Sequence, residues 1–151
     1  MAFSLIVTCL SCSNKKTCPL PDFIHGAYSV ESLLSEAELS NPNYGDFEFI
    51  YLMAVPEWPK IDFDLPQDSV NAYADNFDYH TAPGNMPLVP RLIEKAHARN
   101  TNVLLCFLGQ KEFLPFLEKP ERLSKFTEYI VRLIDRNDYD GDDIDWEITI
   151  D

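Results

Sequence analysis

Short apolar runs alternate with segments of helical periodicity from Phe23 to the end of the chain. Continuous apolar runs of about four to eight residues are typical of buried strands, and apolar residues spaced three and four apart are typical of a helix with one buried face. Strands are therefore predicted at 23–28, 47–55, 102–109 and 143–150, and helices at 30–39, 88–96 and 120–136. Strands that alternate with helices indicate βαβ units and a parallel sheet, so the predicted fold class is α/β.

The segment 56–87 interrupts this alternation. It contains five prolines with Asp and Asn between them, and it is predicted to be a long irregular loop. The aromatic residues Trp58, Tyr73, Phe77 and Tyr79 fall in it. Anchoring of the loop against the sheet is the interpretation we favour for them, and stacking on a ligand is the alternative.

Two architectures fit such a pattern, an open doubly wound sheet and a (β/α)₈ barrel. No G-x-G-x-x-G and no G-x-x-x-x-G-K-[ST] motif follows any predicted strand, so nucleotide-binding versions have no support. A complete barrel takes about 250 residues. A chain of 151 residues therefore has room for only part of one.

Composition narrows the class of partner. Apolar residues make up 46% and aromatic residues 13% of the chain, enough for a hydrophobic core. The formal net charge is −13 and only 12 residues are Lys or Arg. Contact with phosphates needs clustered cations, so we expect no nucleic-acid partner and no docking on an anionic membrane face.

Residues 1–20 are interpreted as a separate leader. The stretch 2–12 is nearly free of charge but is too short for a transmembrane helix, so no membrane span is expected. Its length suits the apolar h-region of a signal peptide, although no Lys or Arg precedes it and no clean small-x-small cleavage site follows. One interpretation is that the leader exports the protein or carries a lipid anchor on Cys9 or Cys12. The alternatives are a frayed N-terminal tail and a misplaced start codon. The sequence therefore does not fix the cellular compartment.

Cysteine and histidine spacing predicts no metal site. Cys9-x-x-Cys12 is half of a zinc-type pair and no second pair follows. Cys106 lies in an apolar run and is predicted to be a buried thiol. His97 falls on the polar face of a predicted helix and is expected to be solvated.

The acidic stretch 140–147 contains the candidate catalytic residues. In a strand, side chains alternate between faces, so Asp143, Asp145 and Glu147 would share one face at intervals of about 6.5 Å. Burying neighbouring carboxylates is costly and favours a retained proton, which on Glu147 would make a general acid. The alternative without a function is an acidic loop exposed to solvent. A calcium-binding loop is excluded, because the spacing of the acidic residues does not fit one.

The stretch D-G-D-D-I-D-W-E at 140–147 resembles the D-x-x-D-x-D-x-E signature of glycoside hydrolase family 18, the chitinases and related endo-N-acetylglucosaminidases. All four acidic positions match, at Asp140, Asp143, Asp145 and Glu147. More weakly, IHGAY, FEFIYLMA and NVLLCFLG resemble the first three strands of that family's barrel. The resemblance implies that residues 21–151 form a partial (β/α)₈ TIM barrel, about its first four βα units.

The resemblance also implies a substrate and a mechanism. The substrate would be a β-1,4-linked N-acetylglucosamine oligo- or polysaccharide, either chitin or the chitobiose core of N-glycans. Glu147 would protonate the glycosidic oxygen while the substrate's own acetamido oxygen attacks the anomeric carbon. Asp145 would orient the acetamido group, Asp143 would share a proton with it, and Asp140 and Gly141 would be structural. No cofactor and no metal is needed.

The chain departs from the family in its third strand. The family carries S-x-G-G where this chain has Cys-Phe-Leu-Gly at 106–109, and a thiol is a weaker donor than a hydroxyl. The later strands of the barrel are not in the 151 residues, so the fragment alone is expected to be inactive. A non-catalytic chitinase-like lectin and a decayed reading frame are the alternatives.

Overall fold

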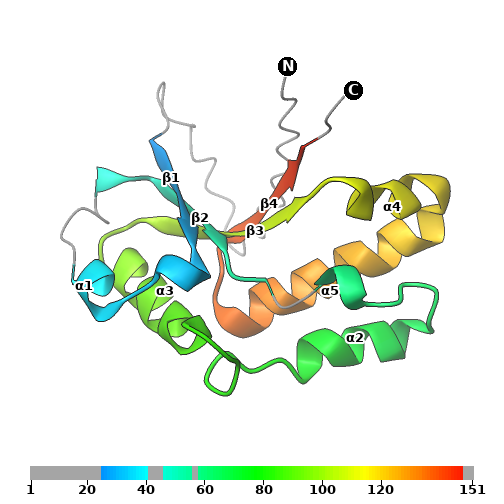
Figure 1. The fold of residues 1–151 in the computed structure, drawn as a ribbon, viewed down its shortest axis with the longest axis horizontal. Coiled ribbons are helices and arrows are strands. Elements are labelled where there is room, and N and C mark those ends of the chain that lie inside the picture. The colour runs from blue at the N-terminus through cyan, green and yellow to red at the C-terminus, as the bar shows by residue number, and fades with distance from the viewer. Residues whose placement is uncertain (1–24, 41–45, 56–57, 148–151) are drawn as a thin grey trace, which may run out of the picture.

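The computed structural model describes residues 25–40, 46–55 and 58–147, and it is an α/β structure. Its four strands are parallel and lie in the order β1-β2-β3-β4 (Figure 1). They are β1 (Gly26–Val30), β2 (Phe49–Met53), β3 (Asn102–Gly109) and β4 (Gly141–Trp146). The predicted leader 1–20, with Cys9, Cys12 and Cys18, lies outside the described residues.

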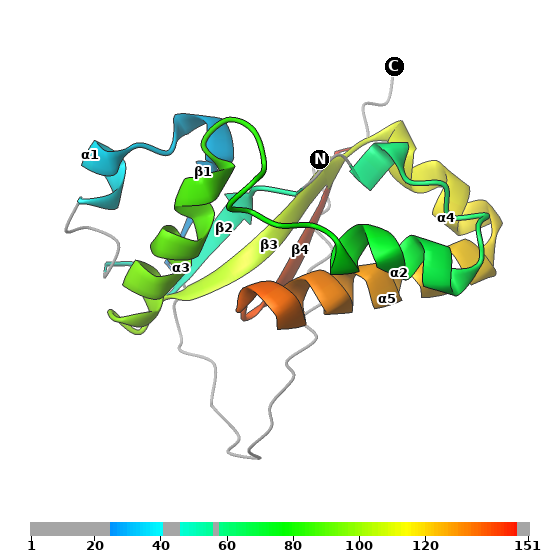
Figure 2. The same ribbon diagram turned by 90° about the horizontal axis from the view of Figure 1, so that it is seen from below.

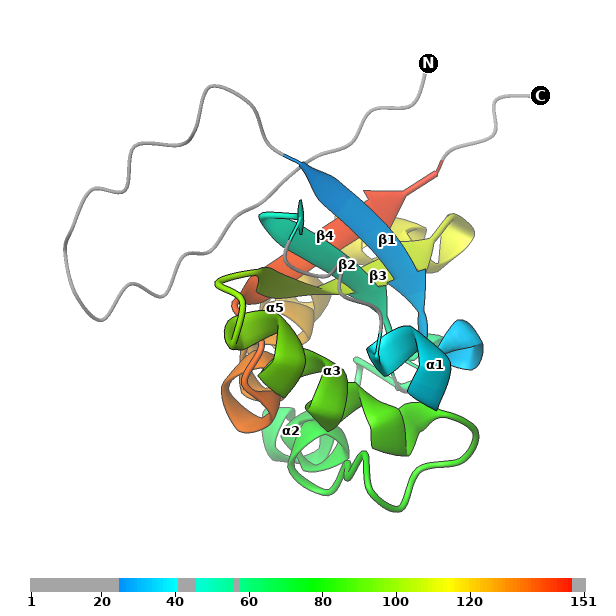
Figure 3. The same ribbon diagram turned by 90° about the vertical axis from the view of Figure 1, so that its left-hand side faces the viewer.

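The helices lie on one face of this sheet (Figures 1 and 3). They are α1 (Glu36–Leu39), α2 (Gln67–Asp75), α3 (Val89–His97), α4 (Leu114–Glu118) and α5 (Pro120–Asn137). Crossovers between parallel strands are almost always right-handed, so adding each strand on the same side of the last keeps every helix on one face. Across the described ranges the strand order never reverses, unlike that of a doubly wound sheet.

The core fills the space between the sheet and the helices. The side chains that β2 and β3 direct at the helices are at most 1% exposed; they are Ile50, Leu52, Val103, Leu105 and Phe107. A second group of aromatic rings joins the turns after β2 and β3 to α5; it comprises Trp58, Phe63, Phe113, Phe116 and Phe126. Strands flanked by helices can be apolar on the covered face throughout, as β3 is.

The strongest periodic patterns predicted their elements well. The strand predicted at 102–109 is β3, and the helix predicted at 120–136 is α5, which runs one residue further. Asp138 ends α5 in the left-handed conformation (φ 61°), in the position that Gly usually occupies. The last predicted strand begins two residues earlier than expected, and its predicted part 148–150 is not described.

Two predictions about the connections were wrong. The single helix predicted at 30–39 is instead a 3₁₀ turn, Glu31–Leu33, followed by the one-turn helix α1. The predicted irregular loop contains the nine-residue helix α2, which lies alongside α5 (Figure 2). Helix α2 has little apolar periodicity because one of its buried positions is Asn71, whose amide donates to Glu128 on α5 at 2.6 Å.

None of the helices in the described part of the chain is long and apolar enough to cross a membrane.

Candidate functional site

Strand β4 carries the acidic motif from one end of the sheet to the other. Asp140 precedes the strand, Asp143 and Asp145 lie within it, and Glu147 follows its last residue. At about 3.3 Å per residue, Asp140 and Glu147 are about 23 Å apart along the strand. They therefore belong to opposite edges of the sheet. In parallel α/β sheets, ligands bind at the edge formed by the carboxyl ends of the strands, where Glu147 lies.

Asp140 secures the start of β4. Its Oδ2 accepts a hydrogen bond from the backbone N–H of Val103 at 2.7 Å, and its own N–H donates to Val103 O at 2.9 Å. His97, at the end of α3, contacts the same Oδ2 through Nε2 at 2.8 Å. The expectation that His97 is merely solvated was therefore wrong, because it links α3 to the strand. The next residue is Gly141. A Cβ atom added there would lie 3.2 Å from Leu104 Cδ2, which is a tight contact.

Asp143 is the buried carboxylate of the motif, with 2% of its surface exposed. It lies on the sheet face that the described helices leave uncovered, in register with Cys106 on β3. The hydroxyl of Tyr28, on β1, donates to its Oδ2 at 3.3 Å. Burial, and then the charges of Asp143 and Asp145, raise the pKa of Tyr28, so this hydroxyl keeps its proton at neutral pH.

Cys106 is the second donor to Asp143. Its thiol is 1% exposed, and burial followed by the hydrogen bond and charge of Asp143 raises its pKa. The thiol therefore stays protonated and donates to the carboxylate. The prediction of a buried thiol is confirmed, and the structure adds its contact with Asp143. A thiol is a weak donor, so this support is weaker than a serine hydroxyl would give.

Asp145 lies further along the same face, in register with Leu108. Burial, the charge of Glu147 and the charge of Asp143, in that order, raise the pKa of Asp145. The carboxyl of Asp145 therefore holds a proton to a higher pH than an isolated aspartic acid does. Leu108, the register partner of Asp145 on β3, is 47% exposed.

Glu147 is exposed at the carboxyl end of β4. Its backbone N–H donates to Gly109 O at 3.1 Å, which extends the pairing of β3 and β4 to this residue. Its charge acts on Asp145, so the two carboxylates are electrostatic neighbours. The chain thus brings Asp143, Asp145 and Glu147 together at one end of the sheet, in order of increasing exposure.

Sequence reasoning missed an aromatic surface beside these carboxylates. The rings of Tyr28 and Tyr51 stack with centroids 4.8 Å apart, and Phe49 lies 6.4 Å from Tyr51. Tyr28 is 54% exposed. The signal was Gly26 in the strand pattern, because a Cβ there would collide with the Tyr51 ring. A glycine inside a strand often marks such a close approach.

The aromatic residues of segment 56–87 serve mainly as anchors, as favoured from the sequence. Trp58 and Tyr79 are 4% and 2% exposed, and the Tyr79 hydroxyl donates to Ala54 O at 2.9 Å. Tyr73, on α2, is the exception at 48% exposed.

Asp142 is a buried acid outside the predicted site. It points to the helix-covered face and is 8% exposed. Burial, and secondarily the charge of Asp143, raise its pKa to about 6. It lies next to the site in sequence but on the other side of the sheet.

No group of three or more His, Cys, Asp or Glu side chains in the described ranges is placed to hold a metal ion. Comparison of the chain with protein-family models, with curated proteins and with solved structures found no match.

Proposed function

We propose that the chain is the N-terminal half of a (β/α)₈ barrel of glycoside hydrolase family 18 type, and that the parent protein hydrolyses β-1,4 linkages of N-acetylglucosamine polymers. The observation that carries the proposal is the placement of three acidic side chains, Asp143, Asp145 and Glu147, along β4 toward its carboxyl end, on the sheet face that the described helices leave uncovered. A barrel has its active site at this edge.

The graded exposure of the three carboxyls supports distinct roles. Exposed Glu147 is the group a substrate can reach, and it is the proposed acid for the glycosidic oxygen. Asp145 lies between the other two, so its carboxyl is the proposed acceptor for the N–H of the acetamido group and holds that group against the anomeric carbon. Asp143 accepts hydrogen bonds from Tyr28 and Cys106 and is the proposed buried partner of Asp145. No step requires a metal or an organic cofactor.

The aromatic surface of Tyr28, Tyr51 and Phe49 supports a carbohydrate as ligand. The apolar faces of sugar rings pack on exposed aromatic rings, and the half-exposed Tyr28 ring lies beside the carboxylate cluster. An uncharged amino sugar also suits a protein with a net charge of −13 better than an anionic one does.

The test uses the longest natural form of the protein and a fluorogenic chitobioside. Glu147→Gln should abolish turnover and retain binding of a chitooligosaccharide by calorimetry. Asp135→Asn, an exposed acid in the last turn of α5, which leads to the opposite end of β4, should leave both unchanged. Turnover by Glu147→Gln at the wild-type rate would refute the assignment of the acid.

A chitinase-like lectin is the second candidate, favoured by one observation. Cys106 and Leu108 occupy the positions where the family signature has Ser and Gly, and Leu108 projects beside Asp145. A lectin binds the oligosaccharide without turnover even with Glu147 intact. The double variant Cys106→Ser, Leu108→Gly distinguishes the candidates further, because restored donor strength and space should raise turnover of an enzyme and should leave a lectin inactive.

A further inference from the structure

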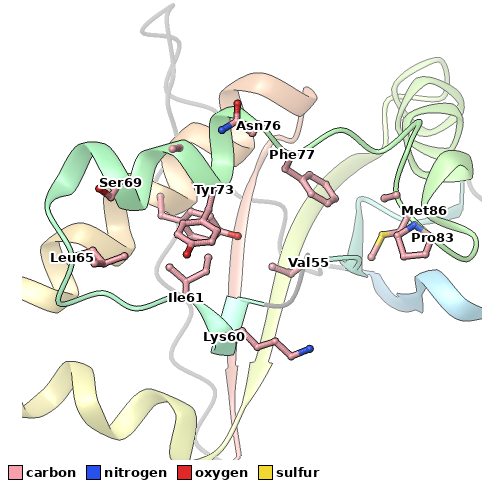
Figure 4. A pocket seen from close by; sticks show the side chains of 13 residues that line it. Val55, Lys60, Ile61, Leu65, Ser69, Tyr73, Asn76, Phe77, Pro83 and Met86 are labelled. Atoms are coloured by element: carbon pink, nitrogen blue, oxygen red, sulfur yellow. The ribbon is translucent and has the colours of Figure 1, made fainter.

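A groove of about 920 Å³ opens on the helix-covered side of the molecule, across the sheet from Asp143 (Figure 4). Its walls come from the segment after β2, from α2 and from the turn before α3. In Figure 4, Ile61, Leu65 and Tyr73 border one side of the opening, Phe77, Pro83 and Met86 the other, and Val55 lies between them. The carbohydrate assignment makes no use of this groove.

A buried hydroxyl without a partner belongs to this groove. Tyr129, from α5, is among the lining residues and has no exposed surface. In the part of the chain that the structure describes, its hydroxyl is the buried side-chain polar atom that lacks a hydrogen bond. Burial of such a group without a partner is costly, so buried polar atoms rarely remain unpaired unless something else pairs with them.

The neighbouring tyrosines show that this is a specific feature of Tyr129. The hydroxyls of Tyr79 and Tyr139 lie 2.7 Å apart and share a hydrogen bond, and Tyr79 also donates to Ala54 O. Burial raises the pKa of Tyr129, so its hydroxyl stays protonated and acts as a donor at neutral pH.

The charge of the groove differs from that of the chain. The chain has 25 acidic residues, yet the described residues that line the groove include no Asp or Glu. One cation, Lys60, stands among them. The rest of the lining is apolar, aromatic or uncharged, which favours an uncharged ligand with a largely apolar body.

We infer that this groove binds an uncharged, mainly apolar small molecule with one carbonyl or similar acceptor oxygen, which accepts a hydrogen bond from Tyr129. The volume lies at the upper end of the range of about 300–1,000 Å³ typical of small-molecule sites. The hydroxyl is covered in the structure, so the ligand gains this bond by displacing a neighbouring side chain.

The test uses prodan, an uncharged naphthalene dye with a single ketone oxygen, and the full 151-residue chain. Saturable binding with blue-shifted emission is expected for the wild-type protein. Tyr129→Phe should weaken binding about fivefold, the effect of one hydrogen bond, and leave the Tm unchanged or higher because it removes an unpaired buried hydroxyl. Ala82→Trp, which places a large ring in the groove, should abolish binding.

Tyr139→Phe is the matched control. It removes a buried hydroxyl that already has a partner and that does not line the groove. It should lower the Tm and leave the Kd for prodan unchanged. Far-UV circular dichroism checks that each variant is folded. Absence of saturable binding to the wild type, equal Kd values for Tyr129→Phe and wild type, or undiminished binding by folded Ala82→Trp would each overturn the inference.

Discussion

The Tyr28 hydroxyl donates to Asp143 Oδ2 at 3.3 Å, although the two residues lie on the first and the last strand of the sheet. Three strand spacings amount to about 14 Å. Side chains that stand upright on a flat sheet cannot meet across that distance. The sheet must therefore curve toward the face that the described helices leave uncovered, and this curvature brings the aromatic surface of β1 and β2 beside the acids of β4.

Tyr28→Phe should lower the free energy of unfolding by about 1 kcal/mol, because it removes one hydrogen bond to a carboxylate that is otherwise buried. Urea unfolding followed by circular dichroism measures the change. Tyr73→Phe, a half-exposed tyrosine on α2, is the control and should stay within about 0.5 kcal/mol of wild type. Equal stability of Tyr28→Phe and wild type would mean that the bond across the sheet contributes nothing.

Gly26→Ala should destabilise the protein by about 1–3 kcal/mol, because the new methyl group collides with the Tyr51 ring. Thermal unfolding of the single and double variants measures the coupling. Tyr51→Ala removes the ring, so Gly26→Ala should cost much less in that background. An equal cost in both backgrounds would show that the two residues do not interact.

Asp140→Ala should destabilise the protein by about 1–3 kcal/mol, because it leaves the N–H of Val103 without its side-chain acceptor and breaks the contact with His97. A double-mutant cycle with His97→Ala isolates the contact between the two side chains. We expect a coupling of at least about 0.5 kcal/mol, and strict additivity would contradict the link between α3 and β4.

Stability should fall as the pH rises from about 4 to about 6, because the pKa of Asp142 is raised to about 6 in the folded state. Between its unfolded and folded pKa values the folded protein binds the extra proton, so deprotonation favours unfolding. The expected loss from Asp142 is about 1–3 kcal/mol. Urea midpoints measured across this pH range test the trend.

Asp142→Asn should flatten this pH dependence, since the amide has nearly the same shape and no titrating proton. Asp145 also has a raised pKa and contributes with the same sign, so Asp145→Asn serves as the comparison. An unchanged pH slope in Asp142→Asn would show that another group is responsible.

The candidate site was predictable where it depends on local pattern. The alternation of acids in 140–147 requires only strand geometry, and the structure places Asp143 and Asp145 on one face as expected. The residues that contact these acids from distant parts of the chain could not be predicted from the acidic pattern, however. Tyr28 is 115 positions from Asp143, and only the curvature of the sheet makes them neighbours.

The connections were less predictable because tertiary contacts hold them. Helix α2 follows Pro66 and buries few apolar residues, and the bond from Asn71 to Glu128 joins it to α5. His97 was predicted to be solvated because its partner, Asp140, lies outside its own helix and no local pattern joins the two residues.

The sequence by itself determined the parallel α/β class, β3, α3 and α5, and the shared face of the acids in β4, because these depend on periodicity within a few consecutive residues. Only the tertiary structure decided that the helices of the described ranges cover one face of the sheet, that β1 and β4 curve toward each other, and that the Tyr129 hydroxyl is buried with no hydrogen bond to the described residues. These features depend on how elements that are distant in the sequence pack against each other, and a local sequence pattern does not contain that information.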